Sequence, residues 1–186
     1  RYGASAVVNN NFIRLTPDRQ SHRGWLWNVN AVAFPDWTAT VRFRVSGQGR
    51  TLFGDGLAFW FTQDAYHKDG PLHGYSDEYT GFGILFDTFR NTESGHVHKD
   101  VSLLVNDGNK VTSDGLVLHD GEPVGCDGDF RFHEGRDDFH IATAKSAAKI
   151  SYRDGKVSID LDLRGTGDWV TCIDSEPIEL PAGWDA

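Results

Sequence analysis

Residues 82–91 read Phe-Gly-Ile-Leu-Phe-Asp-Thr-Phe-Arg-Asn. The first five form an apolar run, and the residues that follow are mostly polar. A second apolar run, Leu-Ala-Phe-Trp-Phe, occupies residues 57–61 and directly follows Gly54-Asp55-Gly56. Short apolar runs rich in aromatic and branched residues and bounded by Gly or Asp are typical of strands that are covered on both faces. We therefore predict that both runs are core strands of a β-sandwich.

The chain on either side of these runs also has strand character. Residues 37–45 alternate, with apolar side chains at every second position and Arg42 and Arg44 on the opposite face, which predicts a strand with one solvated side. Residues 106–108 (Asn-Asp-Gly) and 154–155 (Asp-Gly) predict hairpin turns, because these residue types tolerate positive φ angles. Sustained helical periodicity is almost absent, so we predict an all-β fold of antiparallel sheets packed as a sandwich or jelly roll.

Two long segments, 64–80 and 107–122, lack a strand pattern and are rich in Gly, Asp and His. We predict that they are loops, and long loops on a rigid sandwich are common locations for binding residues.

The composition limits the classes of partner. The 186 residues carry a net charge of -9, with 27 acidic against 18 basic side chains, which argues against nucleic acid as a partner. No apolar stretch approaches the roughly 18 residues of a membrane-spanning helix. Two cysteines, Cys126 and Cys172, permit one disulfide, although two separate buried thiols are an equally open alternative.

The polar end of the first run is the best candidate for chemistry. Asp87, Phe89 and Asn91 are spaced by two, so in an extended chain they can face one centre with a carboxylate, a carbonyl and an amide oxygen. Oxygen ligands of this kind suit calcium better than zinc. The alternative is that Asp87 and Asn91 merely end a strand and begin a turn. The glycines on either side of Asp55 allow an unusual backbone that presents its carboxylate at the sheet edge.

Several blocks of sequence, taken in order, resemble the L-type (legume-like) lectins, and among them the cargo lectins of the VIP36 and ERGIC-53 group in the early secretory pathway. The resemblance extends over nearly the whole chain. The matching blocks are FIRLTP (12–17), GWLWN (24–28), GDGLAFW (54–60), FDTFRN (86–91), GC (125–126), and WVTCI (169–173) followed by LP (180–181).

The resemblance implies a concanavalin-like antiparallel sandwich that binds calcium and the mannose of high-mannose N-glycans. Carried over position by position, Asp87, the carbonyl of Phe89 and Asn91 are expected calcium ligands. Asp55 and Asn91 are expected to contact sugar hydroxyls, and Ser21 is expected to make a more peripheral sugar contact. The ring of Phe89 offers an apolar surface for the C–H face of the sugar.

The chain departs from the family pattern at His119 and Asp120. The family separates the corresponding His and Asp by two residues, whereas here they are adjacent. We assign His119 to the sugar and Asp120 to the metal, with Asp114 as a rival ligand; adjacent residues on an extended chain point oppositely, so both roles require a tight loop. A manganese site of the plant-lectin type is not expected, because Leu85 occupies the position of its Glu.

The resemblance also implies that Cys126 and Cys172 form a disulfide, which indicates the lumen of the endoplasmic reticulum or Golgi, or the outside of the cell. The function expected is glycoprotein sorting or quality control through mannose binding. One alternative is a lectin-like structural subunit whose sugar site has decayed. A glycosidase is the other, but Asp160 and Asp162 are the only alternating acidic pair found on a strand, and we interpret them as its solvated face, so we predict no enzymatic activity.

The extent of the domain is a further expectation. We interpret residues 1–186 as a single carbohydrate-recognition domain from which the last sandwich strands are missing, or whose open edge a partner covers. Any membrane anchor is expected outside this chain.

Overall fold

The computed structural model describes residues 1–89, 99–110, 118–119, 122–137 and 139–180. Within these ranges the regular structure consists of strands alone, and no helix is long and apolar enough to cross a membrane. The strands are β1 (Tyr2–Ala4), β2 (Val7–Val8), β3 (Ile13–Arg14), β4 (Gly24–Leu26), β5 (Trp37–Phe43), β6 (Val45–Gly47), β7 (Gly56–Thr62), β8 (Glu78–Asp87), β9 (Val101–Lys110), β10 (Leu118–His119), β11 (Glu122–Pro123), β12 (Gly125–Cys126), β13 (Arg131–His133), β14 (Ser146–Arg153), β15 (Lys156–Asp162) and β16 (Val170–Asp174).

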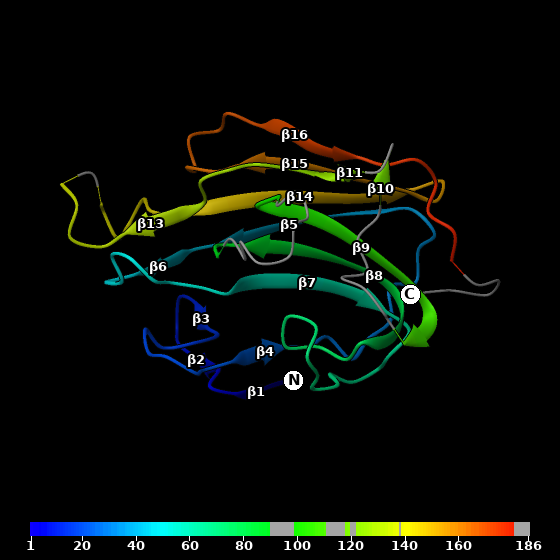
Figure 1. Cartoon of the computed structure of the whole chain (residues 1–186), viewed down its shortest axis with the longest axis horizontal. Coiled ribbons are helices and arrows are strands. Elements are labelled where there is room, and N and C mark those ends of the chain that lie inside the picture. The colour runs from blue at the N-terminus through cyan, green and yellow to red at the C-terminus, as the bar shows by residue number, and fades with distance from the viewer. Residues whose placement is uncertain (90–98, 111–117, 120–121, 138, 181–186) are drawn as a thin grey trace.

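Two four-stranded antiparallel sheets form the body of the molecule. One has the strand order β12-β9-β8-β7 and the other β16-β15-β14-β5, and Figure 1 shows them stacked one above the other. Both apolar runs belong to the first sheet, where β7, the last strand in that order, pairs along its whole length with β8, from Gly56↔Asp87 to Thr62↔Gly81. The prediction of an antiparallel sandwich is confirmed.

The core lies between the two sheets and follows the alternation of the strands. Phe82, Ile84 and Phe86 of β8 are fully buried, and they belong to one cluster with Ile150 of β14 and Ile159 of β15. Because alternate side chains of a strand point to one face, each of these strands contributes every second residue to this core. Each large apolar side chain buried in this way stabilises the fold by about 1.5–3 kcal/mol.

The solvated strand and one of the two predicted hairpins are confirmed. The side chains of β5 alternate between partly buried and exposed, with Arg42 on the exposed face. Strands β14 and β15 are joined by Asp154 and Gly155, whose φ angles of 49° and 77° are those of a tight hairpin turn.

The turn predicted at residues 106–108 is wrong, because β9 continues through it to Lys110. The register advances by two residues on β8, from Thr80 to Glu78, while β9 advances by three, so the extra residue forms a β-bulge. Gly108, with φ of 102°, supplies the positive angle, and the Asp107 carboxylate accepts the Asn109 N–H at 3.1 Å.

The two long loops are shorter than predicted. Residues 78–80 of the first belong to β8, and the remainder of this segment, 64–77, packs through aromatic contacts. His67 stacks on Trp25 with ring centroids 4.7 Å apart, and Tyr75 packs against Trp60 at 4.9 Å, on the face of β7 opposite the core. The second segment contains the end of β9 and the short strands β10 and β11, with residues 111–117 and 120–121 outside the described part.

The predicted disulfide is confirmed: Cys126 of β12 is bonded to Cys172 of β16. Since β12 and β16 are edge strands of different sheets, this bond ties the two layers of the sandwich together.

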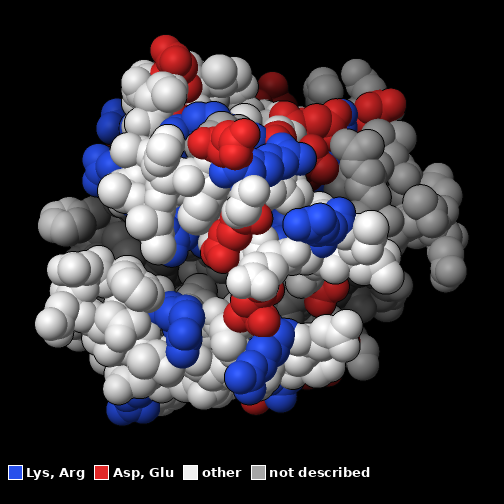
Figure 2. All heavy atoms as spheres, turned by 90° about the vertical axis from the view of Figure 1, so that its left-hand side faces the viewer, with Lys and Arg blue, Asp and Glu red and all other residues white. Residues whose placement is uncertain are grey.

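Figure 2 shows acidic and basic side chains intermixed on one end of the molecule, without an extended basic surface on that face.

Candidate functional site

The pairing of β7 with β8 brings Asp55 beside the polar end of β8. Gly56 lies opposite Asp87, so Asp55, which precedes β7, meets the residues that follow β8. The N–H of Thr88 donates to the Asp55 carbonyl at 2.8 Å, and the Thr88 hydroxyl donates to the same oxygen at 3.2 Å. These bonds join two segments that are more than 30 residues apart in the sequence. They use the backbone carbonyl of Asp55, so its exposed side chain takes no part in them.

Both glycines that flank Asp55 are required by close approach. A side chain at Gly54 would place its Cβ 2.7 Å from the Cβ of Phe89, and one at Gly56 would place it 2.0 Å from the Phe86 carbonyl oxygen. Gly56 also has a φ of 146°, which L residues rarely adopt, and the Gly54–Asp55 peptide bond is cis. The unusual backbone predicted around Asp55 is confirmed.

Hydrogen bonds within the segment from Asp87 to Phe89, and from it to Asp100, fix its backbone. The N–H of Phe89 donates to Oδ1 of Asp87 at 2.8 Å, which curls the chain as it leaves β8. The N–H of Asp87 donates to the Asp100 carbonyl at 2.8 Å, and the Asp100 carboxylate accepts the Gly128 N–H at 2.9 Å. Asp100 is a positioning residue that the sequence offers no signal to identify, since it contributes a backbone carbonyl from 13 positions further along the chain.

The oxygen donors in this segment are of the type that calcium prefers. The described residues contribute the half-buried carboxylate of Asp87 and the carbonyl of Phe89, whose side chain is 36% exposed. Within the described ranges no three His, Cys, Asp or Glu side chains cluster around one point. The other expected ligands, Asn91 and Asp120, and the rival Asp114, lie outside the described residues.

Two further site residues have known backbone positions. His119 is in β10, where its backbone pairs with that of Glu122 in β11. Ser21 is exposed, has a φ of 59°, and precedes β4, which pairs with β1 rather than with β7 or β8. The described contacts do not bring Ser21 to Asp55, and its predicted role as a peripheral sugar contact stays a prediction.

The residue before this site is anchored by β13. The Phe53 ring lies 4.0 Å from the guanidinium carbon of Arg131, and its centroid is 5.5 Å from that of His133. Arg131 is buried, and this burial lowers the pKa of its guanidinium. The sequence did not identify Arg131, because nothing in a linear pattern pairs residue 53 with residue 131.

The acidic pair on β15 has structural roles. Hydrogen bonds from Lys149, at 2.7 Å, and from Thr171, at 2.8 Å, lower the pKa of Asp160. The solvated position predicted for Asp162 is wrong: it is buried, and its carboxylate accepts the N–H groups of Thr166 and Gly167 at 3.0 and 2.9 Å. The strand ends at Asp162, so the following loop folds back over its side chain and removes it from water.

Comparison with known proteins shows extensive similarity to one group. The chain is 32% identical over 185 residues to the vesicular integral-membrane protein VIP36 of Canis lupus familiaris, covering 98% of this chain and 49% of the relative. It is 35% identical over 186 residues to a VIP36-like protein of Mus musculus, covering 97% and 50%. The chain thus spans about half the length of these curated relatives.

A solved structure extends this similarity to three dimensions. The crystal structure of the VIP36 exoplasmic/lumenal domain in its Ca²⁺/Man3GlcNAc-bound form matches with a TM-score of 0.79 and 32% identity, over 97% of this chain and 71% of that one. The match confirms the concanavalin-like sandwich that the sequence resemblance implied.

A model of the legume-like lectin family matches residues 1–184. Lectins bind sugars without altering them, and this match agrees with the prediction of a binding protein rather than an enzyme. With the sandwich, the inter-sheet disulfide and the match over nearly the whole length, the chain belongs to the legume-like lectin family.

Proposed function

We propose that residues 1–186 form a single carbohydrate-recognition domain that binds the mannose of high-mannose N-glycans and requires calcium to do so. One observation carries this proposal: the two hydrogen bonds from Thr88 to the Asp55 carbonyl, at 2.8 and 3.2 Å. They hold Asp55, whose side chain is exposed, next to the segment that carries the oxygen donors of Asp87 and Phe89. An acceptor for sugar hydroxyls beside a group of calcium ligands is the minimum that such binding requires.

The metal ligands proposed are the Asp87 carboxylate, the Phe89 carbonyl, Asn91 and Asp120, with Asp114 as the rival to Asp120. When bound, calcium would supply a fixed positive charge that holds these oxygen atoms in one arrangement. The hydrogen bond from the Phe89 N–H to Asp87 supports the proposal, because it already orients this carboxylate and its neighbouring carbonyl.

The proposed sugar contacts combine hydrogen-bond acceptors, hydrogen-bond donors and one apolar surface. The Asp55 carboxylate accepts a hydrogen bond from a sugar hydroxyl, and the Asn91 amide donates to another. His119 and Ser21 provide further polar contacts. The partly exposed Phe89 ring packs against the C–H face of the sugar. Neutral ligands rich in hydroxyl groups suit this combination.

The cellular role proposed is the sorting or quality control of glycoproteins in the lumen of the endoplasmic reticulum or Golgi, or outside the cell. The disulfide between Cys126 and Cys172 supports an oxidising compartment. The similarity to a vesicular integral-membrane protein supports the secretory pathway, with any membrane anchor outside this chain.

Isothermal titration with α1,2-mannobiose tests this function. Binding is expected with calcium and is expected to disappear in EGTA. Asp55→Asn should abolish sugar binding while calcium binding persists, and Asn91→Ala should abolish both. The matched control is Asp174→Asn, which removes an exposed carboxylate of β16 in the other sheet and should bind as wild type does.

A lectin-like structural subunit with a decayed sugar site is the second candidate. The adjacency of His119 and Asp120 in the sequence favours it, since neighbouring residues on an extended chain point oppositely and His119 lies in strand β10. A folded protein that gives no heat with mannobiose, with or without calcium, would establish this candidate in place of the first.

A further inference from the structure

Residues 48–55 connect β6 to β7 and end on Asp55, the proposed acceptor for a sugar hydroxyl. All residues of this β6–β7 connection are described, and none of them belongs to a strand. Its last residue is fixed by the hydrogen bonds that the Asp55 carbonyl accepts from Thr88. The path of the residues before it is set by side chains that reach them from other segments.

The start of the β6–β7 connection is held by Asp18. The Oδ2 atom of Asp18 accepts the Gln48 N–H at 2.8 Å. A Cβ added to Gly47 would lie 2.6 Å from Oδ1 of Asp18, so the backbone at the end of β6 packs directly against this carboxylate. Asp18 also lies three positions before Ser21, so the segment with this proposed peripheral sugar contact is joined to the connection that leads to Asp55.

Arg131 of β13 contacts the same connection at two further places. Its guanidinium carbon lies 4.0 Å from the Phe53 ring centroid, and its Nη2 donates to the Gly49 carbonyl at 3.4 Å. Phe53 is two positions before Asp55, so the first contact acts near the end of the connection. The Arg131 backbone is itself fixed, because β13 pairs with β6 and places Arg131 opposite Val45. A planar guanidinium can lie on a ring and donate from its edge at the same time, whereas the compact ammonium of lysine cannot.

The burial of Arg131 is difficult to explain by stability alone. The residue is only 8% exposed, and its Nε has no hydrogen-bond partner among the described residues. The carboxylates of Asp18 and Glu134 attract its charge, but burial outweighs this attraction and lowers the pKa of the guanidinium. An apolar side chain of similar size often stabilises such a position as well or better. The arginine is therefore better explained by the geometry that it fixes.

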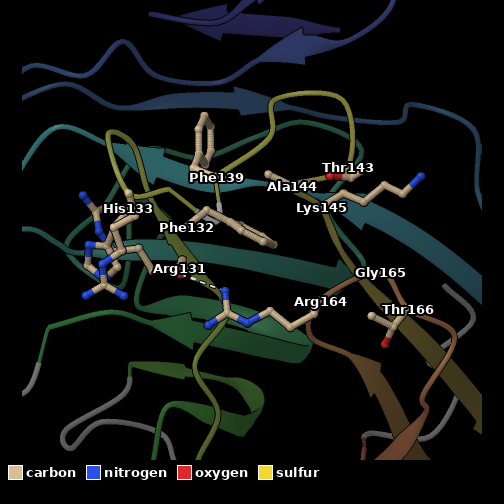
Figure 3. Close-up of a pocket in the computed structure, with 11 residues that line it drawn as sticks. Arg131, Phe132, His133, Phe139, Thr143, Ala144, Lys145, Arg164, Gly165 and Thr166 are labelled. Atoms are coloured by element: carbon tan, nitrogen blue, oxygen red, sulfur yellow. Dashed lines mark hydrogen bonds between the residues drawn. The ribbon is translucent and has the colours of Figure 1, made fainter.

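Arg164 contacts the same strand, but its described contacts do not include the β6–β7 connection. Its Nη1 donates to the Arg131 carbonyl at 3.2 Å, and its Nη2 pairs with the carboxylate of Asp129. Its guanidinium lies 5.0 Å from the Phe132 ring centroid. Figure 3 shows this side chain meeting β13 at Arg131, where a dashed line marks the hydrogen bond. Arg164 is therefore a matched control for Arg131.

We propose that Arg131 is a positioning residue for the mannose site: its guanidinium holds the β6–β7 connection and so sets where the Asp55 carboxylate lies. This inference rests on the proposed function. The polar groups of a binding site have to be held within about 0.5 Å of their productive positions, so a small shift of the connection weakens the hydrogen bond to the sugar. The described contacts of Arg131 include none of the proposed calcium ligands, so the loss should fall on sugar affinity and not on calcium affinity.

Titration calorimetry with α1,2-mannobiose at saturating calcium tests the proposal. Arg131→Gln should bind at least fivefold more weakly than wild type at an unchanged stoichiometry, with calcium affinity within threefold. A merely structural role would lower the stoichiometry, because part of the protein would be unfolded, and would leave the affinity of the folded part unchanged. The conservative variant Arg131→Lys should recover part of the loss, since it keeps a cation near the ring. Arg164→Gln should stay within twofold of wild type.

A second variant tests whether Arg131 acts through Phe53. Phe53→Leu keeps an apolar side chain but loses the ring beneath the guanidinium, so it should also weaken mannobiose binding. The double variant Arg131→Gln/Phe53→Leu should bind more tightly than the product of the two single effects predicts, because both changes remove the same contact. Effects that multiply fully would contradict a shared role.

Amide hydrogen exchange measures the position of the Asp55 segment without sugar. The Thr88 N–H, which donates to the Asp55 carbonyl, should exchange at least fivefold faster in Arg131→Gln. The N–H of Ile159, a residue of the core cluster, should exchange as in wild type, whereas a general loss of stability would accelerate both.

The outcomes separate this inference from the proposed function. If folded wild type does not bind mannobiose, the proposed function fails and the inference fails with it. If wild type binds, the inference alone is overturned when Arg131→Gln binds as tightly as wild type, when Arg164→Gln weakens binding equally, or when Thr88 exchange is unchanged.

Discussion

The disulfide between Cys126 and Cys172 should account for a large part of the stability of this domain. The two residues are 46 positions apart, and the bond joins edge strands of different sheets. In the chain-entropy relation, closing a loop of this length removes about 13–14 cal/mol/K from the unfolded chain, or about 4 kcal/mol at 25 °C. Domains are stable by only about 5–15 kcal/mol, so replacing both residues by alanine should bring the fold close to its limit.

Equilibrium unfolding in urea, followed by tryptophan fluorescence, measures this effect. The Cys126→Ala/Cys172→Ala variant should unfold at lower urea, with a free energy of unfolding about 4 kcal/mol below that of oxidised wild type. Its m-value should rise, because an unfolded chain without the bond exposes more surface. Wild type in dithiothreitol is the internal control and should approach the variant, whose own transition should not respond to the reductant. A loss below about 1 kcal/mol would refute the view that this bond acts by restricting the unfolded chain.

Three other changes test separate parts of the structure. Gly54→Ala should lower the free energy of unfolding by about 1–3 kcal/mol, because the added Cβ collides with Phe89. Gly49→Ala is the control and should lower it by less, since its Cβ meets nothing closer than 3.4 Å; urea unfolding measures both. Ile150→Ala should cost about 2–5 kcal/mol by leaving a cavity between the sheets, measured in the same way. Burial lowers the pKa of His67 in the folded protein, so on acidification the unfolded chain takes up this proton at a higher pH than the folded one. The free energy of unfolding should therefore fall as the pH drops below about 6.5, and it should fall less in His67→Gln.

The fold could be predicted wherever the pattern is local. The apolar runs of β7 and β8 and the Asp154–Gly155 hairpin depend on neighbours in the sequence, and all three are present. Residues 106–108 carry the same turn signal as Asp154–Gly155, yet form a bulge. The difference lies in β8, which extends back to Glu78 and keeps β9 paired beyond the glycine.

The site could be predicted only in part, because its parts meet through pairing between distant segments. The spacing from Asp87 to Asn91 indicates a group of oxygen donors, but no local rule places Asp55 beside them; the resemblance to lectins supplied that link. The anchoring of Phe53 by Arg131 had no such guide. A buried arginine in a three-residue strand has no distinctive sequence pattern, so it becomes visible only when β13 is seen to pair with β6.

The way in which the site is attached to the fold explains why family membership does not by itself establish sugar binding. The core depends on alternating side chains of β8, β14 and β15, whereas the Asp55 segment is joined to β8 through the Asp55 carbonyl and a backbone N–H. Replacing the Asp55 side chain leaves those backbone bonds in place, and the sandwich, its disulfide and its similarity to relatives would all persist. A chain of this family can therefore keep its fold and lose its ligand, and we expect the exposed carboxylate of Asp55 to be the group that distinguishes the two cases.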